Sequence, residues 1–552
     1  MSNNKRQSNR NASSTVERNA STSDQSKKQS RTPNRRHTKP KKQQGETVRE
    51  KIARDSRKPT ANDVSWYVRN AELAKSAASI QFASILGTPY TAAGATVPGV
   101  SAFTWTPAFG SQDLVALNQS SDSMYSYVVH ANSRDYSYDA PDQMILIIAG
   151  MNVFSFLGSL IRVYGILKKY EEENLYYPDV LIRAVGFNPS DLRDNLSHMW
   201  FDINNLIDQS RQIWIPNVFP QLQRWFWLNS NVFLDAPSSR AQSYVFVQKH
   251  YFAYSEVKYR TGGSLVWHKQ GDVYAFGPDQ NYTWQQAVQF AQSMIQKLID
   301  SQDRGNIYAN LLNAYGRENL YALSPIPADF KLEPAYNAEV LMQIENATFF
   351  KYGIGEIFQS NNRIKTAWQH DIIKDSAEKT SANYGVTQSI LNFHVDGQPS
   401  PDMIIEATRA KVGGFLTQTV FVSGNTDGAT SADLPALNNL VVPYAVGSEI
   451  LHDWILFGDP KGASVLVNPV RIPGPGGGDY WSDVMSFDWH PFLYVITAES
   501  DVPVQTPAGQ SALANEINRA YGDFDNYTLL PVENLKKLHD MCLFSLWGVP
   551  HI

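Results

Sequence analysis

Positive charge is concentrated at the N-terminus of this chain, and this segregation limits what the first sixty residues can fold into. Residues 1–60 contain 17 Lys and Arg against 5 Asp and Glu, a net charge of +12. The whole chain carries −5, so residues 61–552 carry −17. The N-terminal segment contains no Phe, Trp or Tyr. It therefore buries too little apolar surface to offset the entropy of ordering it, and we predict a disordered basic arm over residues 1–60.

A flexible polycation of this kind is typical of segments that bind nucleic acid, because phosphate contacts release condensed counterions regardless of base sequence. Aromatic residues are not interleaved with the cations, so stacking on bases is not expected. A nuclear-import signal, a transit peptide and a solubilising tail remain alternative interpretations. The predicted nucleic-acid-binding residues are Lys5, Arg6, Arg10, Arg18, Lys27, Lys28, Arg31, Arg35, Arg36, Lys39, Lys41 and Lys42.

The remaining residues, about 490 in number, exceed what one hydrophobic core usually supports, so two or more domains are expected. A hydrophobic content of 43% and an aromatic content of 12% are ample for a large core. Cys542 is the only cysteine, which excludes an intrachain disulfide and a cysteine-based metal cluster. It lies in an apolar stretch, and we expect a buried thiol made in a reducing cytoplasm.

Hydrophobic periodicity predicts several long helices and two strand-rich segments. Residues 88–140 are rich in Gly, Ser and Thr and are expected to be irregular. Strands are expected within 243–277 and 383–424. The helices are expected at 62–86, 141–173, 190–210, 283–300, 306–316, 335–350, 509–521 and 532–546.

One segment, residues 144–161, is apolar enough to raise the question of a membrane span. Arg162 follows it directly, and the helical pattern continues to Lys168 and Lys169. We therefore predict a fully buried central helix, with a helix that emerges to perturb a membrane as the alternative.

A search for motifs that carry chemistry finds none. The Gly-rich loop at 474–478 lacks the Lys-Ser/Thr of a phosphate-binding loop, and the histidines do not show the spacing of a zinc site. No Gly-x-Ser-x-Gly elbow is present. We predict no catalytic residue, no metal and no cofactor, although a site built from distant residues is not excluded by such a search.

An acidic folded part with a basic tether suits packaging, because many folded parts can pack side by side while their arms share one polyanion. A jelly-roll coat would show about eight short strands in succession, whereas this chain shows long helices. In length and layout it resembles the picobirnavirus capsid protein family. The resemblance spans the whole chain and is carried by Asn62–Gly87, Pro141–Tyr170 and the terminal Phe544-Ser545-Leu546-Trp547-Gly548. The expected fold is a predominantly α-helical α+β capsid fold, not a jelly roll.

The resemblance implies a coat protein that self-assembles into an icosahedral T=1 shell of sixty two-fold homodimers, with segments exchanged between partners in some cases. It implies a helical shell domain (61–240 and 431–552) beneath a mixed α/β projecting or dimerisation domain (241–430). The aromatic stretch at 214–233 and the strand-rich middle become candidates for dimer or projecting surfaces. The arm would face inward and hold viral genomic double-stranded RNA.

The same resemblance implies location in the virion after assembly in the host cytoplasm, with a host membrane or receptor as a further partner. Some family members trim the N-terminus by self-cleavage, for which the Asn-Ala bonds at Asn11, Asn19 and Asn70 are chemically suitable. Three alternatives stay open. They are a non-viral RNA-binding adaptor or chaperone, an enzyme with a localising tail, and a shell protein that perturbs membranes during cell entry through residues 144–161.

Overall fold

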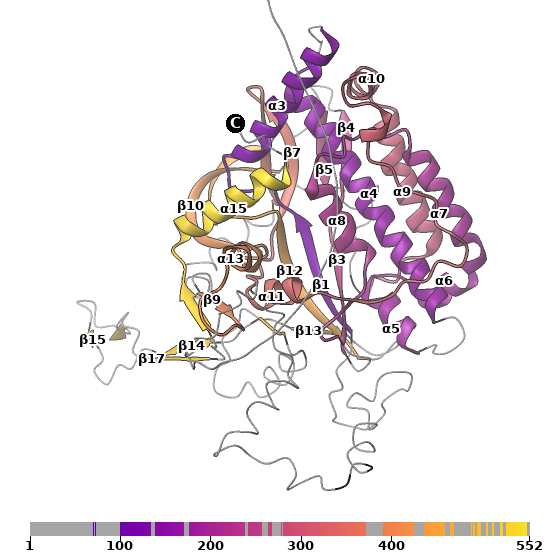
Figure 1. Ribbon diagram of the computed structural model, residues 1–552. Coiled ribbons are helices and arrows are strands. Elements are labelled where there is room, and N and C mark those ends of the chain that lie inside the picture. The colour runs from indigo at the N-terminus through magenta and orange to yellow at the C-terminus, as the bar shows by residue number, and fades with distance from the viewer. Residues whose placement is uncertain are drawn as a thin grey trace, which may run out of the picture. The chain divides into compact units, whose positions relative to one another are not determined.

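The computed structural model in Figure 1 describes most of the chain beyond residue 99. Contacts divide the chain into two units, Met1–Ile80 and Gln81–Ile552. In the first unit only Asn70 and Glu72 are described, and the other described residues belong to the second. The described residues are 70, 72, 100–133, 138–170, 176–237, 241–256, 263–267, 278, 280–370, 390–423, 435–458, 464–467, 487, 489–491, 494–497, 504–505, 511–512, 519–522 and 526–548.

Helices and strands both contribute extensively to the second unit, which confirms the α+β class. The helices are α3 (Val115–Asn132), α4 (Ala140–Lys169), α5 (Tyr176–Ala184), α6 (Pro189–Asp194), α7 (Leu196–Ser210), α8 (Pro220–Ser230), α9 (Trp284–Ile299), α10 (Arg304–Tyr315), η2 (Arg317–Asn319), α11 (Ala338–Glu345), α13 (Pro401–Ala407) and α15 (Val532–Leu546). The strands are β1 (Val100–Pro107), β2 (Phe233–Leu234), β3 (Ser243–Gln248), β4 (Phe252–Glu256), β5 (Gly263–Trp267), β6 (Ala335–Tyr336), β7 (Ile354–Ser360), β8 (Arg363–Trp368), β9 (Ile390–Phe393), β10 (Gly413–Val422), β11 (Ala436–Ala445), β12 (Glu449–Phe457), β13 (Val465–Val467), β14 (Tyr494–Thr497), β15 (Val504–Gln505), β16 (Ser511–Ala512), β17 (Arg519–Gly522) and β18 (Asn526–Leu529).

The first large sheet has the order β13-β12-β1-β3-β2-β6 and is built around β1. This strand is buried along its whole length, pairs antiparallel with β12 and pairs parallel with β3. Its Phe103 ring lies 5.8 Å from the ring centroids of both Phe246 and Trp454. Aromatic side chains from three strands distant in sequence therefore fix the centre of the sheet.

The second large sheet has the order β11-β10-β8-β7-β5-β4. Strands β7 and β8 are joined by Asn361 and Asn362, whose φ angles are 53° and 54°. Two consecutive residues with positive φ form the type of hairpin turn in which Asn is favoured, so the local sequence favours this turn. Strands β10 and β11 form a long antiparallel pair, and the far end of β10 pairs parallel with β8.

Helix α4 is the central helix of this unit. Its residues are apolar on all sides, and every one from Ala140 to Leu167 is buried. It begins after Asp139, with Pro141 in the first turn, and the Asp142 carboxylate accepts a hydrogen bond of 3.1 Å from the Asp139 N–H. Among the described residues, this is the one helix long and apolar enough to cross a membrane, but the whole apolar window is buried. The predicted buried central helix is confirmed.

Polar side chains hold α4 in one position against β3 and α8. Ser155 Oγ donates to Gln248 Oε1 at 2.6 Å, and Asn229 Nδ2 donates to the same oxygen at 2.8 Å. Gln248 Nε2 in turn donates to Asn152 Oδ1 at 3.1 Å. A buried hydrogen-bond network of this kind favours a single register between the elements that carry it.

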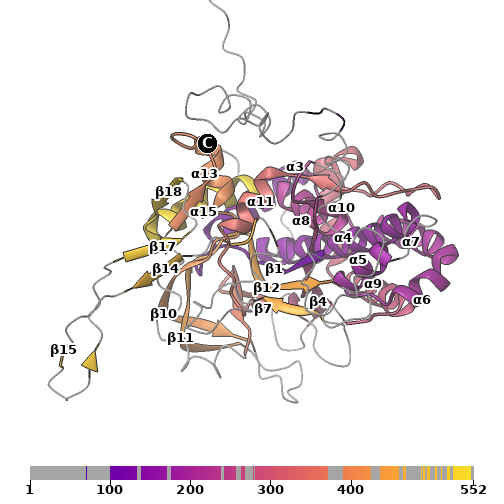
Figure 2. The ribbon, with the colours of Figure 1, turned by 90° about the horizontal axis from the view of Figure 1, so that it is seen from below.

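Figures 1 and 2 show α4, α7 and α9 on one side of β1 and β3, with β10, α13 and α15 on the other side. One large hydrophobic cluster includes residues from both sheets, α4, α8, α9 and the end of α15. A small second cluster lies under α11, β9 and α13, and consists of Met342, Leu391, Phe393 and Ala407.

Several local predictions are confirmed and others are wrong. The helix predicted from residue 283 begins with Thr283 as its cap, since Thr283 Oγ1 accepts from the Gln286 N–H at 3.3 Å. The helix predicted at 532–546 is α15. The helix predicted at 190–210 is divided into α6 and α7 at Asn195. The prediction at 509–521 is wrong, because the described residues there form β16 and β17.

The prediction that residues 88–140 are irregular is also wrong, because they contain β1 and α3. Helix α3 has few large apolar residues, but its small polar side chains are buried and bonded. Ser120 Oγ donates to Trp547 O at 2.6 Å, and Ser121 Oγ donates to Ala140 O at 2.8 Å. The partners of this helix lie far away in sequence, so local composition does not reveal them.

Candidate nucleic-acid interface and self-association surfaces

The predicted nucleic-acid-binding arm lies outside the described residues. This applies to Lys5, Arg6, Arg10, Arg18, Lys27, Lys28, Arg31, Arg35, Arg36, Lys39, Lys41 and Lys42. It also applies to two candidate self-cleavage positions, Asn11 and Asn19. The third, Asn70, is described: its Oδ1 accepts a hydrogen bond of 2.9 Å from the Glu72 N–H.

Cations of the folded unit are paired with its own acids in several places. Arg224 Nε lies 2.8 Å from Glu449 Oε1, and Lys249 Nζ lies 3.1 Å from Asp453 Oδ2. Further pairs are Arg193–Asp179, Lys169–Glu333, Arg363–Asp122 and Lys536 with Asp113 and Asp540. These pairs neutralise cations that a nucleic-acid groove would need, in a part of the chain whose net charge is already negative.

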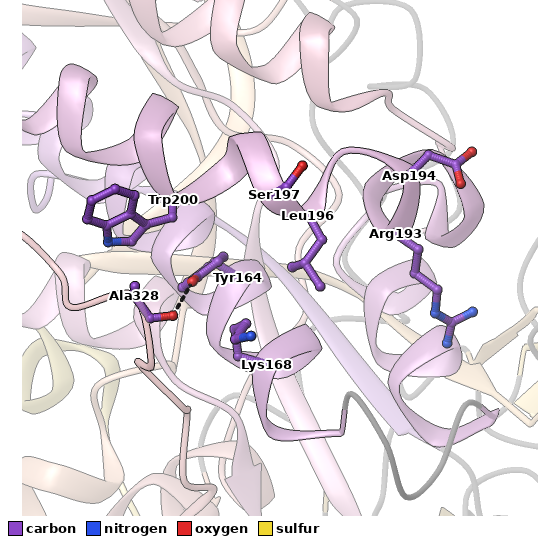
Figure 3. A pocket seen from close by; sticks show the side chains of 8 residues that line it. All are labelled: Tyr164, Lys168, Arg193, Asp194, Leu196, Ser197, Trp200 and Ala328. Atoms are coloured by element: carbon purple, nitrogen blue, oxygen red, sulfur yellow. Dashed lines mark hydrogen bonds between the residues drawn. The ribbon is translucent and has the colours of Figure 1, made fainter.

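A pocket of about 490 Å³ opens where the end of α4 meets α6 and the start of α7 (Figure 3). Its polar groups are engaged within the protein: Tyr164 Oη donates to Ala328 O at 2.6 Å, and Trp200 Nε1 donates to Ile326 O at 2.8 Å. In this view Lys168 and Arg193 lie on either side of Leu196 and do not converge. The lining residues contain neither His nor Cys.

Beside this pocket, α7 presents two adjacent aromatic side chains to solvent. The exposed fraction is 37% for Trp200 and 64% for Phe201. Both lie off the helix stripe formed by Met199, Ile203 and Leu206, which is buried. We call Trp200 and Phe201 the α7 surface. Exposed adjacent aromatics at this level are typical of surfaces that contact another molecule.

A second apolar surface lies between α13 and α15. A groove of about 450 Å³ is lined there by Pro399, Pro401, Ile404, Ile405, Leu538, Met541 and Gln398. The side chain of Met541 is 59% exposed, and on the neighbouring β18 those of Tyr527 and Leu529 are 56% and 69% exposed. This α13/α15 groove and the α7 surface lie far apart in both Figure 1 and Figure 2.

In the aromatic stretch at 214–233, a candidate dimer or projecting surface, Trp214, Phe226 and Trp227 are half-buried against the core. Phe219, Trp225 and Phe233 are buried. The Trp225 ring packs at 6.5 Å from Trp105 and at 6.2 Å from Trp547. These side chains join α8 to β1 and the end of α15, so they are not available to a partner.

Family comparison decides what kind of protein this architecture belongs to. A family model described as picobirnavirus capsid protein matches residues 66–459. The chain belongs to the picobirnavirus capsid protein family. The capsid protein precursor of human picobirnavirus (strain Human/Thailand/Hy005102/-) is 23% identical over 559 residues, covering 91% of this chain and 94% of the relative. The crystal structure of the picobirnavirus capsid matches with a TM-score of 0.63 and 19% identity, covering 88% of this chain and 98% of that chain.

Membership of the picobirnavirus capsid family confirms the resemblance seen in the sequence. The chain is a structural coat protein of the virion, and it associates with copies of itself in a shell. The matched relatives are capsid proteins, in agreement with the prediction of a structural rather than an enzymatic role. Cys542, predicted to be buried, is half-buried on α15.

Sequence reasoning missed both apolar surfaces of this coat protein. For the α7 surface a signal was present, because Trp200 and Phe201 fall outside the stripe that steps through Met199, Ile203 and Leu206. Large aromatics off the buried stripe of an amphipathic helix point to a contact surface. For the α13/α15 groove no local signal exists, since it forms between segments more than a hundred residues apart.

Proposed function

We propose that this coat protein packages double-stranded RNA through its N-terminal arm, inside an icosahedral T=1 shell of sixty dimers assembled in the host cytoplasm. The observation that carries the proposal is the separation of charge between the arm, at +12, and residues 61–552, at −17. The family-model match begins at residue 66, just beyond the arm. The cations therefore lie in a separate segment ahead of the residues that the family model matches.

Electrostatics supports a division of labour between the two parts. Long-range attraction for phosphate resides in the arm, whereas the folded unit is acidic and pairs several of its cations internally. A sequence-independent polycation neutralises packaged RNA without a shaped binding site. The proposal thus needs no nucleic-acid groove on the folded unit.

We further propose that residues 61–240 and 431–552 form a shell domain and that 241–430 form a projecting or dimerisation domain. The sheet around β1 joins β3, from the second range, to β12, from the first range, so the two domains would share a continuous sheet. The long buried α4 and the parallel pairing of β1 with β3 favour a shell wall that is not a jelly roll.

Removal of the arm tests the packaging role. Particles made from the chain lacking residues 2–45, which loses 12 of the 17 arm cations, should retain the coat fold but lose most of their nuclease-protected RNA. Replacement of the same twelve residues by Gln should have the same effect at unchanged length. If all twelve contact phosphate, the slope of log affinity against log salt should reach about −11 and should flatten in the Gln variant.

A charge-preserving exchange of Lys for Arg, and of Arg for Lys, at the twelve positions is the matched control. It should leave the RNA content unchanged, because neutralisation depends on charge number and not on base contacts. Full RNA content in particles of the Gln variant would refute the packaging role of the arm.

A further inference from the structure

Helix α15 lies in a groove whose floor is formed by glycines. A Cβ at any of three glycines would lie within 3.1 Å of a side-chain atom of α15. The approaches are Gly414 to Val532, Gly447 to His539 Nδ1 at 3.1 Å, and Gly110 to Leu543 Cδ1 at 2.8 Å. Positions 532, 539 and 543 are seven and four residues apart, so they share one helix face. This face brings an ionisable side chain, His539, into the groove with 1% of its surface exposed.

The hydrogen bonds of His539 define its neutral form. Its Nε2 lies 2.9 Å from the carbonyl oxygen of Lys411. A carbonyl oxygen only accepts, so Nε2 carries the hydrogen and Nδ1 carries the lone pair. Nδ1 is buried and has no hydrogen-bond partner among the described residues. A proton added at Nδ1 would therefore find no acceptor as long as α15 stays docked.

The charged surroundings of His539 are predominantly positive. Arg409 and Lys411 are buried beside it, with 4% and 1% of their surfaces exposed. The buried acid of this region, Glu449, is engaged by Arg224 at 2.8 Å and by the Ser448 hydroxyl at 2.8 Å.

The other elements packed against α15 carry few charged groups, and several of these groups are paired. Strands β10 and β11 contain no Asp, Glu, Lys, Arg or His. On α3, Asp122 pairs with Arg363. On α15 itself, Lys536 pairs with Asp113 and Asp540. On α13, burial and then the negative charges of Glu339 and Asp402 raise the pKa of Glu406.

Burial, and then the charge of Arg409, lower the pKa of His539 to about 3. Burial also lowers the pKa of Lys411, to about 7. Once α15 leaves the groove, His539 regains its ordinary pKa of 6.5. For His539 the sign follows directly: its contribution to docking is fully present above pH 6.5 and is lost as the pH falls through that value, because the released helix binds the proton and the docked helix does not.

We propose that α15 is an acid-released strap, in which uptake of a proton at Nδ1 of His539 drives the helix out of its glycine-floored groove. Release would uncover the inner face of Trp547, whose ring packs on Phe109, Phe219 and Trp225. It would also free the Ser120 hydroxyl, which now donates to the Trp547 carbonyl at 2.6 Å. The inference concerns the folded unit alone and does not depend on the packaging proposal.

The single cysteine of the chain serves as a reporter, because Cys542 is half-buried on α15. The full-length protein is treated with 4,4′-dithiodipyridine, which reacts with thiols in mild acid, and each rate is divided by that of the denatured protein at the same pH. From pH 7.5 to pH 5.0 the normalised rate should rise by about 30-fold. Hydrogen exchange in β1 should show no matching rise, which separates local release from global unfolding.

Two substitutions distinguish the trigger from general acid sensitivity. His539→Gln keeps a donor for the Lys411 carbonyl but cannot titrate, and its reactivity should change less than about threefold over this pH range. His198→Gln, at an exposed position of α7, should behave like the unmodified protein. If His539→Gln fails to fold, the pH profile of the Cys542 rate in the unmodified protein decides. A rise that begins as the pH falls through 6.5 supports His539, whereas a rise that is complete by pH 7 would assign the response to Lys411, whose pKa lies at about 7.

Three results would overturn the proposal that acid releases α15. One is an unchanged rate between pH 7.5 and 5.0 in the unmodified protein. Another is a full acid response in His539→Gln. The third is a rise in β1 exchange that parallels the Cys542 rate, which would mean that acid unfolds the whole unit.

Discussion

At the scale of single residues, Glu449 shows how buried charge is balanced in this coat protein. Burial alone would raise the pKa of its carboxyl, but Arg224 and Arg409 outweigh that effect, so the pKa lies below its ordinary value. The chain of contacts is short: Arg409 Nη2 donates to Ser448 Oγ at 2.6 Å, and that hydroxyl donates to Glu449 Oε2 at 2.8 Å. A carboxyl with a depressed pKa stabilises the fold above its unfolded pKa of 4.5, and this stabilisation is lost as the pH falls through the lower folded value.

The substitution Glu449→Gln should destabilise the protein strongly. It leaves the buried Arg409 and the half-buried Arg224 without their counter-charge, and the removal of one partner of a buried pair costs about 3–5 kcal/mol. Urea unfolding at pH 7.5, followed by tryptophan fluorescence, measures the change.

Glu333→Gln is the matched control, because Glu333 pairs with Lys169 while its side chain is 76% exposed. Its effect should stay below about 1 kcal/mol. Equal changes in the free energy of unfolding for the two substitutions would show that the buried pair of Glu449 stabilises the protein no more than an exposed pair does.

At the scale of elements, the glycines of α4 show why this helix packs so closely. A Cβ at Gly165 would lie 2.7 Å from Leu332 Cβ and 3.1 Å from the Leu332 backbone nitrogen. That nitrogen donates to the Gly165 carbonyl at 3.1 Å, so the loop is bonded to the helix at the point of closest approach.

Gly165→Ala should therefore destabilise the protein by about 1–3 kcal/mol, although alanine has the higher helix propensity. Gly305→Ala in α10 is the control, since no atom lies within 4 Å of its Cβ position. That change should be neutral or stabilising by up to about 1 kcal/mol. Thermal unfolding compares the two, and a stabilising Gly165→Ala would contradict the close approach.

Apolar patterns and capping signals made some helices predictable from the sequence and left other elements unpredicted. Helices α4, α9 and α15 were predictable because each carries a clear apolar pattern and a cap or stop signal, such as Asp139 with Pro141 or Thr283. The break at Asn195 was not, since the apolar stripe continues through it. Strand β1 and helix α3 were missed because their burial is decided by partners hundreds of residues away.

At the scale of the whole molecule, the family and the division of charge were predictable, but the exposed apolar surfaces were not. The charge division is a sum over the sequence. The α13/α15 groove depends on how distant segments meet, and the α7 surface was visible only as two aromatics off the buried stripe. The twelve arm residues and the predicted shell and projecting ranges stay predictions.

The α7 surface gives a prediction for assembly. Phe201→Ser should leave the unfolding midpoint nearly unchanged, because the side chain is 64% exposed and exposed substitutions usually change stability by less than about 0.5 kcal/mol. If Phe201 is buried between copies, the substitution removes about 1.5–3 kcal/mol of association free energy per contact. The protein concentration needed for assembly then rises about tenfold or more.

Light scattering during assembly measures this concentration. Asn205→Ser, at an exposed polar position of the same helix, is the control and should assemble like the unmodified protein. Normal assembly of Phe201→Ser would remove the α7 surface from the candidate contacts between copies.

The pairing of β1 with β12 has a consequence for how the chain is made. Thr104 and Asp453, bonded at 3.0 Å across these strands, are 349 residues apart. At about 5–20 residues per second, a ribosome needs about 17–70 s to supply the second strand after the first has emerged. During that interval the strand destined for the middle of the sheet has an open edge and uncovered aromatics, so each nascent coat protein must be kept from its neighbours on the same polysome until its own C-terminal half arrives.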